Sequence, residues 1–115
     1  AASLSITKQI SPVPVNENGT LTYTFLIQNY GGTDVSAGEN VILRDTFDPL
    51  LSDISAALNG TALTTADYTY DTVSGVFATN AGVITVPAAT FSQNATTGEW
   101  TVTPGLTTVT VSGTI

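Results

Sequence analysis

Three side chains in this sequence have the types and positions to form a covalent cross-link: Lys8, Asn29 and Asp45. Each shares the two-residue parity of the apolar residues around it, so each is expected to point toward the interior of a sheet. Burial disfavours the charged form of a lysine, and a protonated acid nearby would activate an amide or carboxyl carbon for attack by the amine. The cluster therefore predicts a site for an intramolecular isopeptide bond.

A second interpretation of the same residues involves no covalent chemistry. Lys8 can extend its ammonium group toward solvent or pair with Asp45, because buried charges are usually paired. Asn29 can cap the turn that begins at Tyr30 and Gly31. Both interpretations stay open from the sequence, and the mass of the intact chain distinguishes them.

Calcium is the metal that the acidic residues could bind. Asp45, Asp48 and Asp53 form one group in the sequence, and Asp67 and Asp71 form another. Extracellular β domains often hold Ca²⁺ with loop carboxylates and backbone carbonyls, but the spacing here matches no EF-hand loop. Asp45, Asp48 and Asp53 are therefore weak calcium candidates, and the other interpretation is that these acids are solvated or cap turns.

Aromatic side chains offer a second kind of site. Tyr30, Tyr68, Tyr70 and Trp100 could stack against a carbohydrate or contact a surface protein. In a small β domain, aromatic residues also belong to the core or its rim, so this alternative stays open as well.

Catalysis is not expected. Nine acids necessarily offer carboxylate pairs of the kind that glycoside hydrolysis uses, but the sequence has no His, no Cys and no recognisable nucleophile motif. We therefore expect a protein that is not an enzyme and needs no cofactor.

The charge balance excludes several classes of partner. Nine acids against Lys8 and Arg44 give a net charge of -7, which disfavours nucleic acid and anionic membrane surfaces. No apolar run approaches the ~18 residues of a membrane span, so membrane insertion is not expected. The absence of Cys and Met leaves little to oxidise, which suits an extracellular or cell-surface location.

The elements that would position these side chains are strands. In Leu21–Asn29 the residues Leu21, Tyr23, Phe25 and Ile27 fall on one face, and hydroxyl-bearing residues fall on the other. This period of two is typical of a half-buried strand. At 115 residues the chain is long enough for one two-layer core, so residues 1–115 are expected to form a single domain.

Other short alternating segments are separated by turn residues at ~8–12-residue spacing, which is typical of a sandwich. They are 4–10, 41–47, 54–58, 61–63, 67–71, 76–78, 83–86, 88–91, 100–102 and 107–115. We expect an all-β, immunoglobulin-like antiparallel sandwich of about seven to nine strands.

Local signals refine this expectation. Pro12 and Pro14 end the first strand, and Asn16–Gly19 turns the chain into the central strand. Asn59-Gly60 is the strongest hairpin signal in the chain. The two terminal segments, 4–10 and 107–115, are expected to be edge strands, and both alternate strongly.

Several motifs resemble the DUF11 repeat of bacterial and archaeal surface proteins. They are Leu4-Ser5-Ile6-Thr7-Lys8, Gly19–Phe25, Gln28-Asn29-Tyr30-Gly31, Leu43–Phe47, Leu58-Asn59-Gly60-Thr61, Asp67–Tyr70, Gly82–Ala88 and Val109–Gly113. The resemblance spans nearly the whole chain. It implies an immunoglobulin-like sandwich, usually repeated in tandem in cell-wall proteins, S-layer-associated proteins, adhesins and fibres, and it brings no catalytic residues.

The isopeptide hypothesis departs from a known pattern at one point. Gram-positive pilin and adhesin domains that form such bonds carry the reacting Asn on their last strand, whereas 107–115 holds neither Asn nor Asp.

The alternation and the DUF11 resemblance together favour a non-catalytic stalk, spacer or filament subunit whose partners are neighbouring copies, with strand addition between copies as one route of assembly. The alternative is an adhesin module that binds carbohydrate or a surface protein through exposed aromatic residues.

Overall fold

The fold comes from a computed structural model that describes residues 2–11 and 19–115. The strands in chain order are β1 (Leu4–Ser11), β2 (Thr20–Asn29), β3 (Arg44–Thr46), β4 (Ser52–Leu58), β5 (Thr61–Ala62), β6 (Tyr68–Tyr70), β7 (Val76–Thr79), β8 (Thr90–Gln93), β9 (Trp100–Thr103) and β10 (Gly105–Thr114), with one 3-10 turn, η1 (Ala37–Glu39). Every strand pairing is antiparallel. The expected breaks at Pro12 and Pro14 and the turn from Asn16 to Asn18 lie outside the described residues.

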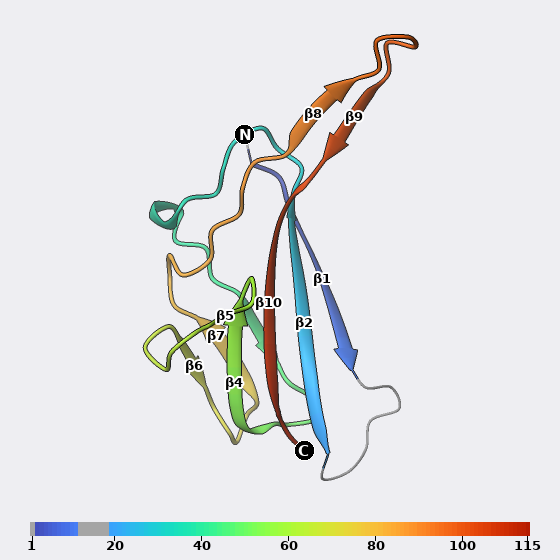
Figure 1. The fold of residues 1–115 in the computed structure, drawn as a ribbon. Helices are drawn as coiled ribbons and strands as arrows, with labels where there is room; N and C mark the ends of the chain where they lie inside the picture. The colour runs from blue at the N-terminus through green and yellow to red at the C-terminus, as the bar shows by residue number, and fades with distance from the viewer. Residues whose placement is uncertain (1, 12–18) are drawn as a thin grey trace.

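The larger sheet has the strand order β1-β2-β10-β4-β5, and its centre is the long pair β2 and β10 (Figure 1). Leu21, Tyr23, Phe25 and Ile27 of β2 are all buried, which confirms the face predicted from alternation. β1 lies at one edge of the sheet, as expected. The expectation that 107–115 forms the other edge is wrong, because β10 pairs with β2 on one side and with β4 on the other.

A smaller sheet, of order β3-β7-β6, covers the inner face of the larger one. Three rings join the layers: Tyr23 of β2 stacks on Phe47 at 4.4 Å between centroids, and Phe47 stacks on Phe77 of β7 at 5.5 Å. The buried apolar residues form one cluster between the sheets. The all-β sandwich-like fold is thus confirmed.

Residues 2–11 and 19–115 form ten strands, where about seven to nine were expected. The excess has two sources. β5 is only two residues long and closes a hairpin with β4, in which Asn59 and Gly60 both have positive φ (49° and 82°), as a two-residue turn requires. β8 and β9 form a separate two-stranded hairpin that projects beyond the sheets (Figure 1).

In two of the expected strands, 41–47 and 83–86, fewer than half of the residues form a strand, because other groups replace the regular backbone ladder. In 41–47 only Arg44–Thr46 is a strand, and Leu43 instead donates its N–H to the hydroxyl of Thr79 (2.9 Å) while its carbonyl accepts from Thr79 N (2.9 Å). In 83–86 only Val86 is paired, through a bridge to Val35.

No helix among the described residues is long and apolar enough to cross a membrane.

Candidate functional site

Lys8 and Asp45 meet at the edge of the sandwich, where β1 of the larger sheet passes β3 of the smaller one. The Lys8 Nζ lies 2.5 Å from Asp45 Oδ2, and the two side chains are 38% and 25% exposed. Asp45 Oδ2 is shielded from solvent, and its one partner among the described residues is this ammonium group. The two residues therefore form an ion pair that ties the two layers together at this edge.

Tyr23 lies directly beneath this pair. Its ring lies 4.7 Å from Lys8 Nζ, within the range of a cation–π contact, and its hydroxyl donates to the Pro49 carbonyl at 2.9 Å. Burial raises the pKa of the Tyr23 hydroxyl, and the neighbouring carboxylates of Asp45 and Asp48 raise it further. Alternation predicts Tyr23 as a core residue, but it does not reveal that this hydroxyl and the Lys8–Asp45 pair share one site.

Asn29 lies apart from Lys8 and Asp45. In the β1–β2 register it pairs with Leu4, whereas Lys8 pairs with Phe25, a separation of four residues or roughly 13 Å along the strand. Shared parity places residues on one face, but it does not fix their distance along that face. The structure thus brings two members of the expected cluster together and leaves the third outside it.

The Asn29 side chain is fully buried and makes four hydrogen bonds. Its amide nitrogen donates to the carbonyls of Thr33 (2.8 Å) and Pro87 (3.2 Å), and its Oδ1 accepts from the N–H groups of Ser3 (3.1 Å) and Gly31 (2.9 Å). These bonds hold three separate segments at one end of β2. Asn29 therefore does cap the turn at Gly31, and its amide is committed to that structural role.

In the part of the chain that the structure describes, no three Asp or Glu side chains lie close enough together to share a metal ion, and this holds for Asp45, Asp48 and Asp53. Asp71 caps a turn, because its Oδ1 accepts hydrogen bonds from the N–H groups of Val73 and Ser74. These hydrogen bonds lower the pKa of its carboxyl group.

The four expected contact aromatics divide into two pairs. Tyr68 and Tyr70 on β6 pack against the core, where Tyr68 lies 5.3 Å from Phe77 between ring centroids. The Tyr70 hydroxyl donates to the Leu51 carbonyl (2.6 Å) and accepts from its N–H (3.0 Å), which fixes the ring inside the fold. Both tyrosine rings therefore take part in packing around the core, and both stay partly exposed.

Tyr30 and Trp100 remain exposed, and Trp100 is 66% accessible on β9. Phe91 is the cross-strand partner of Val102, so Phe91, Trp100 and Val102 lie on one face of the β8–β9 hairpin, because alternate and directly opposed residues share a face. All three side chains are exposed. Sequence reasoning found only Trp100, although the alternation in Phe91-Ser92 and Trp100-Thr101-Val102 could have revealed this apolar face.

The chain was compared with protein-family models, with curated proteins and with solved structures, and none of them matches it.

Proposed function

We propose that this chain is a non-catalytic structural module of a prokaryotic cell-surface protein or extracellular fibre, acting as a stalk, spacer or filament subunit. The surface setting is supported by the resemblance to the DUF11 repeat and by the composition. The mechanical role is supported chiefly by where the first and last strands lie on the larger sheet.

The two ends of the described fold lie at opposite ends of β2 (Figure 1). Leu4 of β1 pairs with Asn29 at one end of β2, and Thr114 of β10 pairs with Thr20 at the other. A pull between the ends would therefore act along the strands and load many cross-strand hydrogen bonds together, because these bonds run perpendicular to the strands. This arrangement suits a module that transmits tension.

The outer face of the larger sheet is also consistent with this role. Thr24 lies opposite Thr110, and Thr22 lies opposite Ser112, with the Thr22 and Ser112 hydroxyl oxygens 2.7 Å apart. Hydroxyl-bearing residues keep β propensity without presenting an apolar surface, which limits indiscriminate association between exposed sheets. Such a surface suits a display module.

Single-molecule stretching of tandem copies tests the proposal. Each copy should unfold as one event that lengthens the chain by roughly 330–360 Å, the extended length of about 110 residues less the roughly 30 Å that the folded ends already span along β2. The unfolding events should occur at forces well above those of a helical domain of similar size measured in the same chain. Unfolding at the force of the helical reference would contradict the mechanical role.

The alternative role, an adhesin module for carbohydrate or a surface protein, is favoured by one observation, the exposure of Trp100 next to Phe91. A glycan array tests it. Binding that Trp100→Ala abolishes and Val73→Ala leaves intact would support the alternative, because Val73 is exposed elsewhere on the surface. An array without signal at high protein concentration would count against it.

A further inference from the structure

Three Asn-x-Thr triplets in the sequence match the acceptor motif for N-linked glycans: Asn18-Gly19-Thr20, Asn59-Gly60-Thr61 and Asn94-Ala95-Thr96. Such triplets also arise by chance in a threonine-rich chain, so the sequence alone does not select among them. The structure describes the second and third completely, whereas Asn18 lies outside the described residues. The surroundings of these two triplets in the fold therefore decide which of them can accept a glycan.

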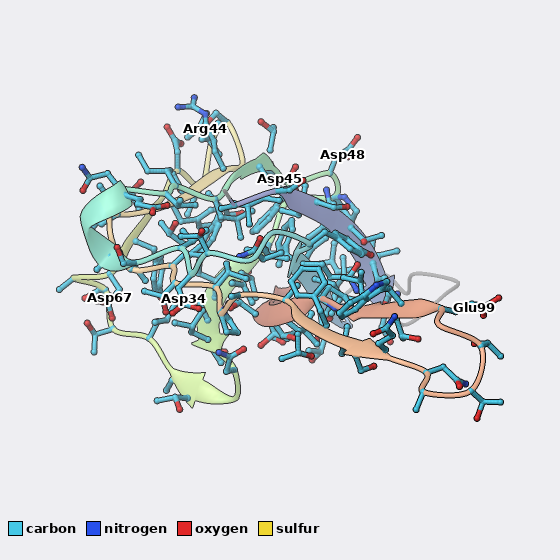
Figure 2. All side chains as sticks on the ribbon, turned by 90° about the horizontal axis from the view of Figure 1, so that it is seen from above. Asp34, Arg44, Asp45, Asp48, Asp67 and Glu99 are labelled. Carbon is cyan, nitrogen blue, oxygen red and sulfur yellow. The ribbon has the colours of Figure 1, made fainter. Side chains whose placement is uncertain are left out.

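The third triplet lies at the tip of the β8–β9 hairpin, in the loop between the two strands. This hairpin projects from the body of the domain (Figure 1), and Figure 2 shows Glu99 on it, away from Arg44 and Asp45. The radius of gyration of 16.5 Å exceeds the roughly 13 Å expected of a compact domain of this length, in keeping with an elongated shape. Residues 91–103 are all exposed. An enzyme can therefore approach Asn94 without meeting the two packed sheets.

Hydrogen bonds fold the tip of the hairpin onto itself. The Asn94 Oδ1 accepts from the N–H groups of Thr96 (2.8 Å) and Thr97 (3.1 Å). The Asn94 carbonyl accepts from Gly98 N–H (2.7 Å), and the Asn94 N–H donates to the Glu99 carbonyl (2.8 Å). Within residues 2–11 and 19–115, neither the Asn94 side-chain nitrogen, Nδ2, nor the Thr96 hydroxyl has a hydrogen-bond partner. The two side-chain groups that the motif requires are thus unengaged, and the tip can open without disturbing the packed sheets.

The second triplet is tied into the larger sheet. The Asn59 Oδ1 accepts from the N–H of Thr108 on β10 (2.8 Å), and the Asn59 N–H donates to the Thr108 carbonyl (2.7 Å). Asn59 and Gly60 form the two-residue turn between β4 and β5, and Thr61 enters the hairpin as the partner of Leu58. A transferase must hold the Asn and the Thr of one triplet in its own site. Access to Asn59 therefore requires this turn to leave β10.

We propose that Asn94, and not Asn59, accepts an N-linked glycan on the folded chain. The donor is an oligosaccharide on a polyprenyl diphosphate, and a membrane-bound oligosaccharyltransferase catalyses the transfer. The Asn94 Nδ2 forms a bond to C1 of the first sugar while the bond between C1 and the diphosphate oxygen breaks. The lipid diphosphate leaves with the electron pair of the broken bond, and one Nδ2 proton passes to a base of the transferase. This inference rests on the extracellular setting of the proposed function and not on its mechanical role.

A purified transferase tests the site directly. The chain is produced in a host that lacks N-glycosylation and is incubated, folded, with a single-subunit oligosaccharyltransferase and a polyprenyl-diphosphate oligosaccharide. Cleavage after acidic residues then separates the triplets, because aspartates lie between Asn59 and Asn94. The fragment 72–99 should gain the mass of one oligosaccharide, and the fragment 54–67 should keep its mass. A synthetic peptide of residues 91–99 is the positive control for the transferase.

Two threonine variants make the test specific. Thr96→Val removes the hydroxyl that the motif requires and should abolish the gain in mass. Thr97→Val is the matched control, because it makes the same change one residue outside the motif, and it should leave the gain intact. A fragment 72–99 of unchanged mass, with a transferase that modifies the peptide, would overturn the proposal, and so would a modified fragment 54–67. Because the purified assay does not depend on where the chain resides, its failure would count against this site and not against the proposed function.

Discussion

The two members of the Lys8–Asp45 pair should respond differently to substitution. Lys8→Met leaves the shielded Asp45 Oδ2 without its ammonium partner, so we expect a loss of about 1–3 kcal/mol in the free energy of unfolding. Asp45→Asn removes the charge as well as the pair. Because both side chains are partly exposed, that loss should be only about 0.5–1 kcal/mol.

Urea denaturation measures both losses. Arg44→Met is the control, because it removes a cation from the strand that carries Asp45 but leaves the Lys8–Asp45 pair intact. Equal losses for Lys8→Met and Asp45→Asn would contradict the view that the carboxylate depends on its lysine.

The mass of the intact chain decides between an ion pair and an isopeptide bond. We expect the full mass, because the Lys8 side chain is 38% exposed rather than buried and lies in an ion pair with Asp45. A deficit of ~18 Da, the mass of one water, would show that the bond had formed. A deficit of ~17 Da, the mass of one ammonia, would instead point to an asparagine, and Asn29, the asparagine of the expected cluster, lies several residues away along the sheet.

The raised pKa of the Tyr23 hydroxyl predicts how the free energy of unfolding changes at alkaline pH. Its folded-state pKa is raised above the ordinary value of 10.0, so its contribution to stability is complete below pH 10 and is lost as the pH rises through the folded-state pKa. Tyr23→Phe should lower stability by about 1 kcal/mol near neutral pH, because the bond to Pro49 is lost, and should reduce the further fall above pH 10.

Thermal unfolding between pH 7 and 11 measures this difference. Tyr30→Phe is the matched control, because it removes the same hydroxyl group from an exposed ring outside the Lys8–Asp45 site. An alkaline fall of equal size in wild type and Tyr23→Phe would show that Tyr23 is not the group responsible.

At the scale of residues, alternation predicts which side chains face inward but not how far apart they lie. It places Lys8, Asn29 and Asp45 on inward faces, and the structure joins only Lys8 with Asp45. The position of Asn29 depends on the strand register, and a register cannot be read from the parity of one strand. The site could therefore be predicted in part.

At the scale of elements, the close passage of β10 over the segment at Pro87 gives a sharp prediction. A Cβ built on Gly105 would lie 1.8 Å from the Pro87 carbonyl oxygen, so Gly105→Ala must displace backbone. We expect a loss of at least about 2–3 kcal/mol in the free energy of unfolding. At Gly38 the nearest atom is 3.9 Å from such a Cβ, so Gly38→Ala should change stability by no more than about 0.5 kcal/mol.

Chemical denaturation of the two alanine variants compares these positions directly. A Gly105→Ala protein as stable as Gly38→Ala would mean that β10 does not approach Pro87 as closely as the structure has it.

The sequence predicts the elements whose causes are local, but it does not predict the position of strands that depend on pairing between distant segments. The alternation of β2 and the Asn59-Gly60 turn identify their elements, because the cause of each structure is local. The central place of β10 is set by pairing with β4, which is far away in the sequence. The segment around Leu43 is held by the Thr79 hydroxyl, a tertiary contact that no local pattern contains.

At the scale of the whole molecule, the two-layer sandwich follows from the sequence, whereas the elongated outline does not. Alternation and turn spacing require apolar faces to meet, which yields two packed sheets. Because Phe91, Trp100 and Val102 alternate like core residues, the same pattern would also fit a strand inside the sandwich. Their exposure on a projecting hairpin is therefore a property of the fold rather than of the pattern.

The central claim is that tension between the two ends of the fold acts along the β1–β2–β10 strands, and comparison of two pulling directions tests it most directly. The chain has no cysteine, so pairs of introduced cysteines define each direction without ambiguity. Handles at Ser3→Cys and Thr114→Cys pull at opposite ends of β2, whereas handles at Ser3→Cys and Tyr30→Cys pull at one end and open β1 from β2 one bond at a time. We predict that the first direction requires a several-fold higher force. Equal forces in the two directions would contradict the mechanical account.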